Sequence, residues 1–490
     1  MSITNRDKIA HLLRRFAFGP TPLELDRFAP LGVEGTLESL LDFKSTDEEF
    51  PISPWEFCRE VGKSEIYTDG YRFAEWWALR LLMSKHPLEQ RLTFFWHSHF
   101  AVGGDKVDFG PMLYSYLETL RKNALGDFPA LLKAVAKEPA MLRYLDGESS
   151  IKDHPNENFA RELFELFCLG KGNYSEQDIQ QAARVFAGWG NRYLMFEMPG
   201  EDVQDKIKEC LRRNVPLVTS SFSPNLADNQ NKLIFGKSAP YDMDSLLEAV
   251  AIRPQTAYFI TEKLWKHFAG CEPTPRVSNR LANTFLKSNG NIIQILREIV
   301  RCDEFWSDNC IQKKIKAPID FVVPILHQFN LQPILKTMRS VDSTPESPLP
   351  KPLRDASGLV LLSMQRQGMM LLFPPNVAGW PEGDAWITPN NLLARGEFAN
   401  LLFGVDQIDH PLASYLAKQI LDSNPITSYN TIIKFLSLFD AHLPAEKQFL
   451  LIQAFDNAGG IESLKTPKGA SRSLGSVARL LFTCPEFQFC

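Results

Sequence analysis

Apolar and polar positions alternate along most of this chain with a period close to that of an α-helix. Apolar residues recur at helical spacing over residues 71–100, 112–124, 127–137, 157–169, 175–187, 244–268 and 291–300. Glycine and proline interrupt the pattern, for example at Gly103-Gly104 and Pro374-Pro375, where we expect helices to end. The pattern therefore predicts a mainly α fold.

Two stretches depart from this period. Residues 191–240 contain short β-prone runs, which predict a small β-hairpin insertion. Residues 337–357 hold four prolines and few apolar residues, so we expect a Pro/Ser-rich connector or surface loop there. We therefore predict a large irregular helical domain over residues 1–402 and a C-terminal helical appendage over residues 403–490.

Composition and charge narrow the class of protein. The chain has 490 residues, of which 44% are hydrophobic, so it can bury a substantial core. Its 53 basic and 58 acidic residues are interleaved and give a formal net charge of -5, which disfavours nucleic acid as a partner. No window reaches 18 uninterrupted apolar residues, so we expect no membrane span.

The start of the chain and its cysteines bear on the cellular compartment. The first residues lack an apolar stretch of signal-peptide length before Arg14 and Arg15, so we expect a cytoplasmic protein. The eight cysteines form no CxxC pair and no regular framework. We expect reduced, mostly buried thiols and no zinc site built from cysteines.

A helix predicted over residues 157–169 collects polar side chains on one arc. Glu157, Asn158, Arg161, Glu162 and Glu165 share this arc, while the remaining positions are mostly apolar. One interpretation is a solvated face with i,i+4 ion pairs. The other is a polar cleft in which Glu162 or Glu165 acts as a base, Arg161 binds an anionic group, Asn158 contacts substrate and Glu157 ligates a metal.

Two further places offer candidate ligands. His97 and His99 follow a long apolar helix and precede Gly103-Gly104, so both imidazoles could turn toward one metal, with Asp146 as a further ligand. The alternative is that they cap terminal carbonyl groups or pack beside Trp96.

The segment at residues 372–398 predicts a rigid loop rich in proline, glycine and tryptophan. Trp380 and Trp386 lie near Asn376, which suits stacking and hydrogen bonding with a sugar or another polar ring. A structural plug over the core is the alternative interpretation.

Several ordered sequence blocks resemble a known family. The blocks are HLLRRFAFGPTPLELD, FWHSHFAV, PAMLRYLD, PNENFARELFELF, GNYSEQDIQQAARVFAGW, KAPIDFVV and PPNVAGWPEGDAWIT. Together, over about residues 10–402, they resemble the bacterial domain-of-unknown-function 1800 family. That family has no established activity. Its members are often exported, and their genes often neighbour those of a sulfatase-like family, so the resemblance implies a sulfatase-like protein as a partner.

The chain departs from the family pattern at several points. From its first residues we expect it to lack the family's usual leader. Ala227 stands where the family commonly shows a His-Asp pair, and Gly147 stands where an Asn often follows the YLD aspartate. These departures imply that a metal centre of the family, if there is one, is altered in this chain.

Two functional hypotheses follow from these residues. The first is a metal-assisted or carboxylate acid–base enzyme that acts on a polar, saccharide-like substrate, with a divalent metal as the cofactor. The second is a non-catalytic binding or scaffold protein that partners a sulfatase-like protein and uses the same polar cluster to tie helices to the Trp380 loop.

Overall fold

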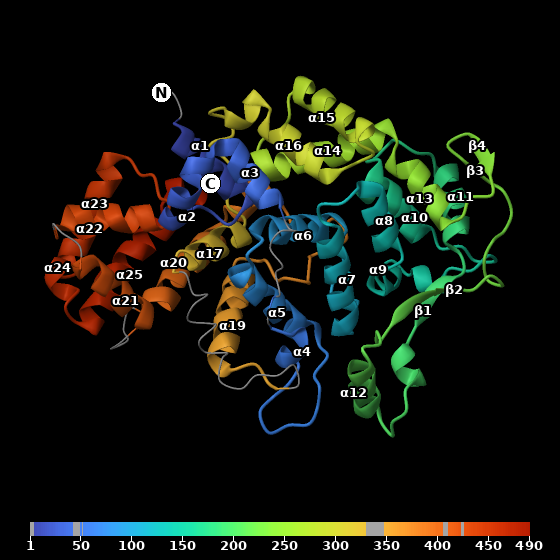
Figure 1. The fold of residues 1–490 in the computed structure, drawn as a ribbon, viewed down its shortest axis with the longest axis horizontal. Helices are drawn as coiled ribbons and strands as arrows, with labels where there is room; N and C mark the ends of the chain where they lie inside the picture. The colour runs from blue at the N-terminus through green and yellow to red at the C-terminus, as the bar shows by residue number, and fades with distance from the viewer. Residues whose placement is uncertain (1–3, 43–49, 51, 330–346, 405–409, 423–425) are drawn as a thin grey trace.

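The computed structural model describes residues 4–42, 50, 52–329, 347–404, 410–422 and 426–490. Helices follow one another through almost all of these residues, and two small antiparallel strand pairs interrupt them (Figure 1). The prediction of a mainly α fold with a small β insertion is confirmed.

The first half of the chain forms a layered set of helices. They are α1 (Asn5–Phe16), α2 (Pro22–Phe28), α3 (Gly32–Leu41), α4 (Pro54–Phe57), α5 (Gly70–Met83), α6 (Pro87–His99), α7 (Gly110–Asn123), α8 (Phe128–Ala136), α9 (Pro139–Tyr144), α10 (Glu157–Glu162) and α11 (Glu176–Phe186). Capping boxes begin several of them: at α11, the Ser175 side chain accepts from the Asp178 amide while the Asp178 carboxylate accepts from the Ser175 amide.

The apolar run at residues 71–100 folds as two helices rather than one. Helix α5 ends at Met83, and α6 begins at Pro87, because proline lacks an amide proton and is tolerated in the first turn but not inside a helix. The run at residues 244–268 divides in the same way, into α13 (Met243–Ala251) and α14 (Pro254–Ala269). Proline thus sets both boundaries.

The insertion lies between α11 and α13. It contains β1 (Trp189–Arg192), α12 (Val203–Arg213) and β2 (Thr219–Phe222), followed by the hairpin strands β3 (Lys232–Ile234) and β4 (Lys237–Ala239). Strand β1 pairs antiparallel with β2, and β3 pairs antiparallel with β4. Figure 1 shows α12 extending away from the helical body.

The second half of the chain returns to helices. They are α15 (Pro275–Lys287), α16 (Ile292–Val300), α17 (Pro318–His327), α19 (Lys351–Arg366), α20 (Pro389–Phe403), α21 (Pro411–Leu421), α22 (Ser428–Leu438), α23 (Ala445–Asn457), α24 (Gly460–Ser463) and α25 (Pro467–Thr483). The last five gather at one end of the molecule, where α25 packs along α20 (Figure 1).

Contacts near the two termini connect helices α20 to α25 to the rest of the described chain. Arg14 Nε and Nη2 donate to the Asp440 carboxylate at 2.5 and 2.8 Å. The amide of Cys490 donates to the carbonyl of Lys314 at 2.9 Å. One hydrophobic cluster includes residues from Ile9 to Phe487, so α20 to α25 share a core with the N-terminal helices.

The structure differs from the loop expected at residues 337–357. Residues 337–346 lie outside the described residues, and α19 begins at Lys351, with Pro352 in its first turn. Proline in the first turn favours the start of a helix, which explains how a proline-rich segment continues into one.

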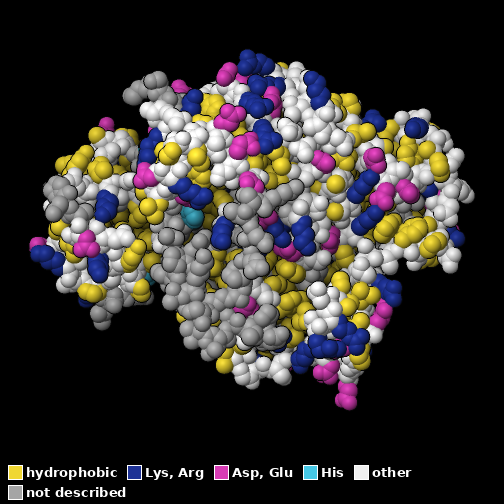
Figure 2. All heavy atoms as spheres, viewed as in Figure 1, with side chains coloured by type: hydrophobic (Ala, Val, Ile, Leu, Met, Phe, Trp, Pro, Cys, Tyr) yellow, Lys and Arg dark blue, Asp and Glu magenta, His cyan; other side chains and the backbone are white. Residues whose placement is uncertain are grey.

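Among the described helices, none is long and apolar enough to cross a membrane. Basic and acidic side chains are interspersed over the face that Figure 2 shows.

Candidate anion-binding site

A cavity of about 710 Å³ lies beside the loop that carries Trp380 and Trp386. Helix α6 provides Phe94, Phe95, Ser98 and His99, and the end of α14 provides Lys263, Lys266 and His267. The remaining walls come from residues 270–272, 313–320 and 369–386. Elements far apart in the sequence therefore meet at this cavity, as is common for ligand sites in proteins.

Lysines line two walls of the cavity. Lys263 and Lys266 project from α14, and Lys313 and Lys314 come from the segment before α17. Four carboxylates also line the cavity, but three of them (Glu272, Glu382 and Asp384) are exposed. The interior of the cavity is therefore more cationic than its rim.

Asp320 is the buried carboxylate of the cavity, and two cations share it. Arg91 Nη1 lies 2.7 Å from Asp320 Oδ1, and Lys314 Nζ lies 3.3 Å from Oδ2. Burial raises the pKa of Asp320, but Lys314 and Arg91 together outweigh it and hold that pKa well below its usual range. Asp320 is therefore ionised, and its charge offsets only one of its two cationic neighbours.

Lys263 interacts with a neutral histidine. Its Nζ lies 3.2 Å from Nδ1 of His99, and it lies 4.7 Å from the ring centroid of Phe259. Among the described residues, Lys263 forms no ion pair within 4 Å. The ammonium group is thus held inside the cavity with no carboxylate at ion-pair distance among the described residues.

The hydrogen bonds of His99 define its tautomer. Nε2 lies 3.1 Å from the carbonyl oxygen of Phe167, and because a carbonyl can only accept, Nε2 carries the proton. Nδ1 is then the acceptor for Lys263. Burial, together with the charge of Lys263, lowers the pKa of His99 well below its ordinary value, so the ring is neutral.

Local structure explains why the carbonyl of Phe167 is available to His99. The chain after α10 forms a π-helical turn over Leu163–Cys168, in which the amide of Leu169 donates to the carbonyl of Phe164 at 2.8 Å. The Phe167 carbonyl is among the last of this helix and has no partner within it. His99 therefore satisfies a group that the helix end leaves open.

The environment lowers the proton affinity of Lys263. Burial is the main cause, Lys266 adds to it, Glu382 opposes it, and the pKa falls from 10.5 to about 8. A lysine with this pKa can both donate and accept a proton near neutral pH.

His267 contributes a second neutral imidazole. Burial and the positive charge of Lys314 and Arg91 lower its pKa well below the ordinary value. Its Nε2 is shielded from solvent and has no hydrogen-bond partner among the described residues. Burial thus leaves this nitrogen without a hydrogen bond in the described part of the chain.

Of the residues predicted for a site, three line this cavity: His99, Trp380 and Trp386. Both indoles are buried, at 5% and 4% exposure. Trp380 stacks with Phe94 and His97, at ring-centroid distances of 5.2 and 5.3 Å, and Trp386 Nε1 donates to the carbonyl of Pro381 at 2.8 Å. Trp380 thus helps to hold the loop against α6, and Trp386 stabilises the loop internally.

His97 lies in a different environment from His99. Its ring packs against Trp77, Tyr116 and Trp380, at centroid distances of 5.3 to 5.9 Å. Burial lowers its pKa to about 3, and neither ring nitrogen has a hydrogen-bond partner among the described residues. The two histidines therefore do not converge on one centre.

The arginine of the acidic helix forms an ion-pair network at the surface. Arg161 Nη2 lies 3.2 Å from Glu157 and 2.6 Å from Glu176. The three side chains are 38%, 41% and 59% exposed. This arrangement matches the interpretation of a solvated face.

The other acids of this helix have different partners. Tyr174 donates to Glu165 at 2.6 Å, and burial and this carboxylate raise the pKa of the tyrosine to about 12. Burial, with Glu165 nearby, raises the pKa of Glu162. None of these residues lines the cavity beside the Trp380 loop.

The remaining predicted residues lie apart. Asp146 pairs with Lys106 at 2.8 Å, and Asn158 Nδ2 donates to the carbonyl of Leu145 at 3.4 Å. Asn376 Oδ1 accepts from the amide of Ala378 at 2.9 Å, which shapes the loop. Within the described part of the chain, no three His, Cys, Asp or Glu side chains are grouped as a metal site would require.

The sequence interpretation missed the lysines and His267. Lys263, Lys266 and His267 stand in EKLWKH near the end of a helix, a position where basic residues commonly interact with the helix dipole. In the sequence, Lys263 and its apolar neighbours follow helical spacing. This spacing is the same as in an ordinary amphipathic helix, so it did not reveal a lysine in a cavity.

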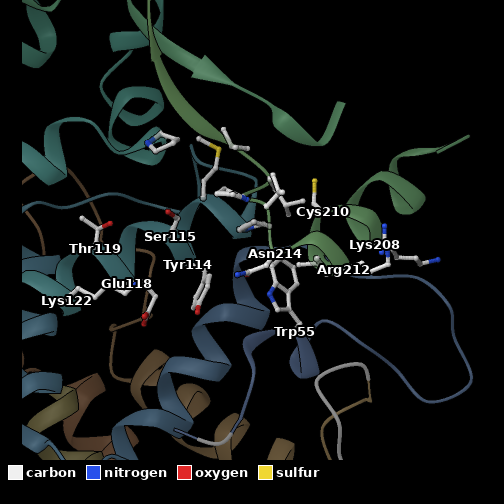
Figure 3. A pocket seen from close by; sticks show the side chains of 18 of the residues that line it. Trp55, Tyr114, Ser115, Glu118, Thr119, Lys122, Lys208, Cys210, Arg212 and Asn214 are labelled. Carbon is white, nitrogen blue, oxygen red and sulfur yellow. The ribbon is translucent and has the colours of Figure 1, made fainter. Parts of the chain in front are cut away.

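A second cavity, of about 730 Å³, lies between α7 and α12. Figure 3 shows Tyr114, Ser115 and Glu118 on one side and Cys210 and Arg212 on the other, with Trp55 nearby. Two of its charged residues are paired locally, Glu118 with Arg121 at 2.8 Å and Arg212 with Glu209 at 2.7 Å, and Arg59, Lys122 and Lys208 also line it. The cavity beside the Trp380 loop is the stronger candidate because it holds a lysine with a lowered pKa beside neutral imidazoles.

Comparison with known proteins identifies the family. Residues 11–489 match the family described as "Protein of unknown function (DUF1800)". The chain belongs to this family, and the match covers the C-terminal helices as well as the N-terminal body. No curated protein and no solved structure matches the chain.

Proposed function

We propose that this protein is an enzyme that binds a polar, anionic small molecule in the cavity beside the Trp380 loop. In this proposal Lys263 exchanges a proton with the ligand. The observation that carries the proposal is the contact between Lys263 and His99: an ammonium group of lowered pKa lies beside a neutral imidazole and has no carboxylate partner among the described residues. Ionisable groups perturbed by burial in a cavity are typical of functional sites.

The charge of the cavity interior supports an anionic ligand. Arg91 and Lys314 share Asp320, and Lys263 adds a further positive charge. Burying uncompensated cations is costly, and a bound carboxylate, phosphate or sulfate group would reduce this cost.

The pKa of Lys263 supports acid–base chemistry. Proton transfer is most efficient when the pKa of the catalytic group lies near the working pH, and a pKa of about 8 meets this condition. His99, fixed by Phe167, positions the lysine. An acid–base reaction was expected from the sequence; the proposal assigns the proton to Lys263 instead of Glu162 or Glu165.

The metal-assisted version of the reaction receives less support from these contacts. Both ring nitrogens of His99 are engaged, by Phe167 and by Lys263, so a metal at His99 would have to displace one of them. Asp146 and Glu157 are paired with Lys106 and Arg161. The proposal therefore rests on protein groups alone.

The proposal is tested by anion binding. Thermal unfolding of the full chain is measured in phosphate, sulfate and citrate, each against sodium chloride of equal ionic strength. Because a ligand that binds the folded state raises the Tm, at least one of these anions should raise it in the wild-type protein and in Lys287→Met, an exposed lysine outside the cavity. Lys263→Met and Lys314→Met should lose most of the increase. An equal increase in all four proteins, or none in the wild type, would contradict the proposal.

A further inference from the structure

Two cysteines meet at the edge of the same cavity. The Sγ atoms of Cys271 and Cys310 lie 2.9 Å apart, although the residues are 39 positions apart in the sequence. Cys271 follows α14 directly after Gly270 and lines the cavity, whereas Cys310 is buried in the segment that leads to Lys313 and Lys314. The pair therefore connects the two lysine-bearing walls.

We propose that Cys271 and Cys310 are a redox-active dithiol, which a small organic disulfide oxidises to an intrachain disulfide at the cavity wall. This inference does not depend on the proposed function. A disulfide bond is about 2.04 Å long, so the sulfurs need to approach by less than about 1 Å. Gly270 and Cys271, which follow α14, and the 307–317 segment can supply this movement, because both stretches lie outside regular helices.

The surroundings assign different roles to the two sulfurs. A hydrogen bond shared with Cys310 is the main influence that lowers the pKa of Cys271, and the positive charge of Arg15 adds to it. Arg15 is itself anchored, with Nη2 donating to the carbonyl of Cys310 at 2.5 Å. Cys271 borders the cavity and is the attacking thiolate, since low pKa and access favour attack. Cys310 is the resolving thiol.

The oxidation proceeds by two exchange steps. The Cys271 thiolate attacks one sulfur of the small disulfide RSSR, forming a mixed disulfide and releasing RS⁻, which takes up a proton. The Cys310 thiol then loses its proton and attacks Sγ of Cys271, and the second RS⁻ leaves and is protonated. Two protein thiols are thereby oxidised to one disulfide, and RSSR is reduced to two RSH.

The disulfide would restrain the cavity. It closes a loop between Cys271 and Cys310 that contains α15 and α16, so it removes conformational freedom from the unfolded chain. It also joins the wall that carries Lys263 to the wall that carries Lys314. Oxidation should therefore raise the Tm by several degrees.

The test uses the folded, full-length chain. The reduced, folded protein is incubated with hydroxyethyl disulfide at pH 8, then unfolded in guanidinium chloride, alkylated with iodoacetamide, digested and analysed by mass spectrometry. We expect a cross-linked peptide joining Cys271 to Cys310, alkylation of the other cysteines, and reversal by dithiothreitol. Alkylation of both cysteines, or a mixed disulfide on Cys271 that does not resolve, would overturn the proposal.

Two variants sharpen the result. Cys310→Ser should stop at a mixed disulfide on Cys271 and should lose the oxidation-dependent rise in Tm. Cys302→Ser is the matched control, because Cys302 is buried nearby in the sequence and burial raises its pKa to about 11. The control should form the same cross-link as the wild type. Should Cys310→Ser fail to fold, the peptide map of the wild-type protein still decides the matter.

Discussion

Nζ of Lys263 lies 3.2 Å from Nδ1 of His99, and Nε2 of the same ring donates to the carbonyl of Phe167. This chain of contacts links α14, α6 and the π-helical turn after α10. Because the imidazole is neutral, it holds the lysine in place without neutralising it. The fold thus keeps a cation inside a cavity, which lowers the free energy of unfolding.

Replacing Lys263 with methionine should stabilise the protein. The folded-state pKa of Lys263 is about 8, below the unfolded value of about 10.4, so the folded state binds the proton less tightly than the unfolded state. The penalty is fully present below pH 8 and disappears as the pH rises through about 10.4. Lys263→Met should therefore gain about 1–3 kcal/mol in free energy of unfolding at pH 7.

Urea denaturation at a series of pH values measures this effect. The difference between Lys263→Met and the wild type should shrink steadily between pH 8 and 10.5. Lys287→Met serves as the control and should stay within about 0.5 kcal/mol of the wild type at each pH. A destabilised Lys263→Met at pH 7 would show that the lysine is compensated in the folded state.

The two predicted histidine ligands should respond differently to the same substitution. His99→Leu strands the Phe167 carbonyl, which should cost about 1–3 kcal/mol. His97→Leu removes a ring whose nitrogens have no hydrogen-bond partner among the described residues, so it should cost less than His99→Leu. Equal losses in denaturation experiments would indicate that the two histidines share a role.

Two arginines of the chain provide a contrast between buried and exposed ion pairs. Arg91→Ala removes buried hydrogen bonds to Asp320 and to the carbonyl of Ala17 while Lys314 still pairs with Asp320, so it should cost about 1–3 kcal/mol. Arg161→Ala breaks exposed pairs and should cost about 0–1 kcal/mol. A large loss for Arg161→Ala would instead favour the scaffold hypothesis, in which this cluster ties helices together.

Lowering the pH should reduce the free energy of unfolding, because Asp320 becomes protonated. Its pKa is depressed in the folded state, so its contribution is present above the unfolded pKa of about 3.9 and is lost as the pH falls below that value. Asp320→Asn should therefore show a shallower loss of stability between pH 5 and 3 than the wild type. Circular dichroism during acid titration, in parallel for both proteins, checks this expectation. Parallel curves for the two proteins would remove Asp320 from the explanation.

Much of the fold could be predicted from the sequence because helices leave a local signal. The runs at residues 127–137 and 175–187 match α8 and α11, and the β-prone stretch at residues 191–240 contains β2, β3, β4 and the end of β1. Two apolar runs each fold as two helices, because Pro87 and Pro254 begin a new helix within a continuous apolar pattern. Element boundaries thus depended on single residues within otherwise continuous patterns.

The site was harder to predict because its residues come from distant segments. His99, Lys263 and Lys314 share no local pattern, and only the packing of three segments brings them together. By contrast, the dense polar arc at Glu157, Arg161 and Glu165 is visible in the sequence, yet Glu157 and Arg161 form an exposed network. Polar density along one helix does not distinguish a cleft from a solvated face.

The most direct test of the central claim is an NMR titration of lysine side chains. The full chain is labelled with ¹³C and ¹⁵N at lysine, and Lys263→Arg assigns the Lys263 signal. We expect Lys263 to titrate near pH 8 in chloride and at a higher pH when phosphate or another bound anion stabilises its ammonium form. Titration of Lys263 above pH 10, together with no response to any anion, would contradict the account.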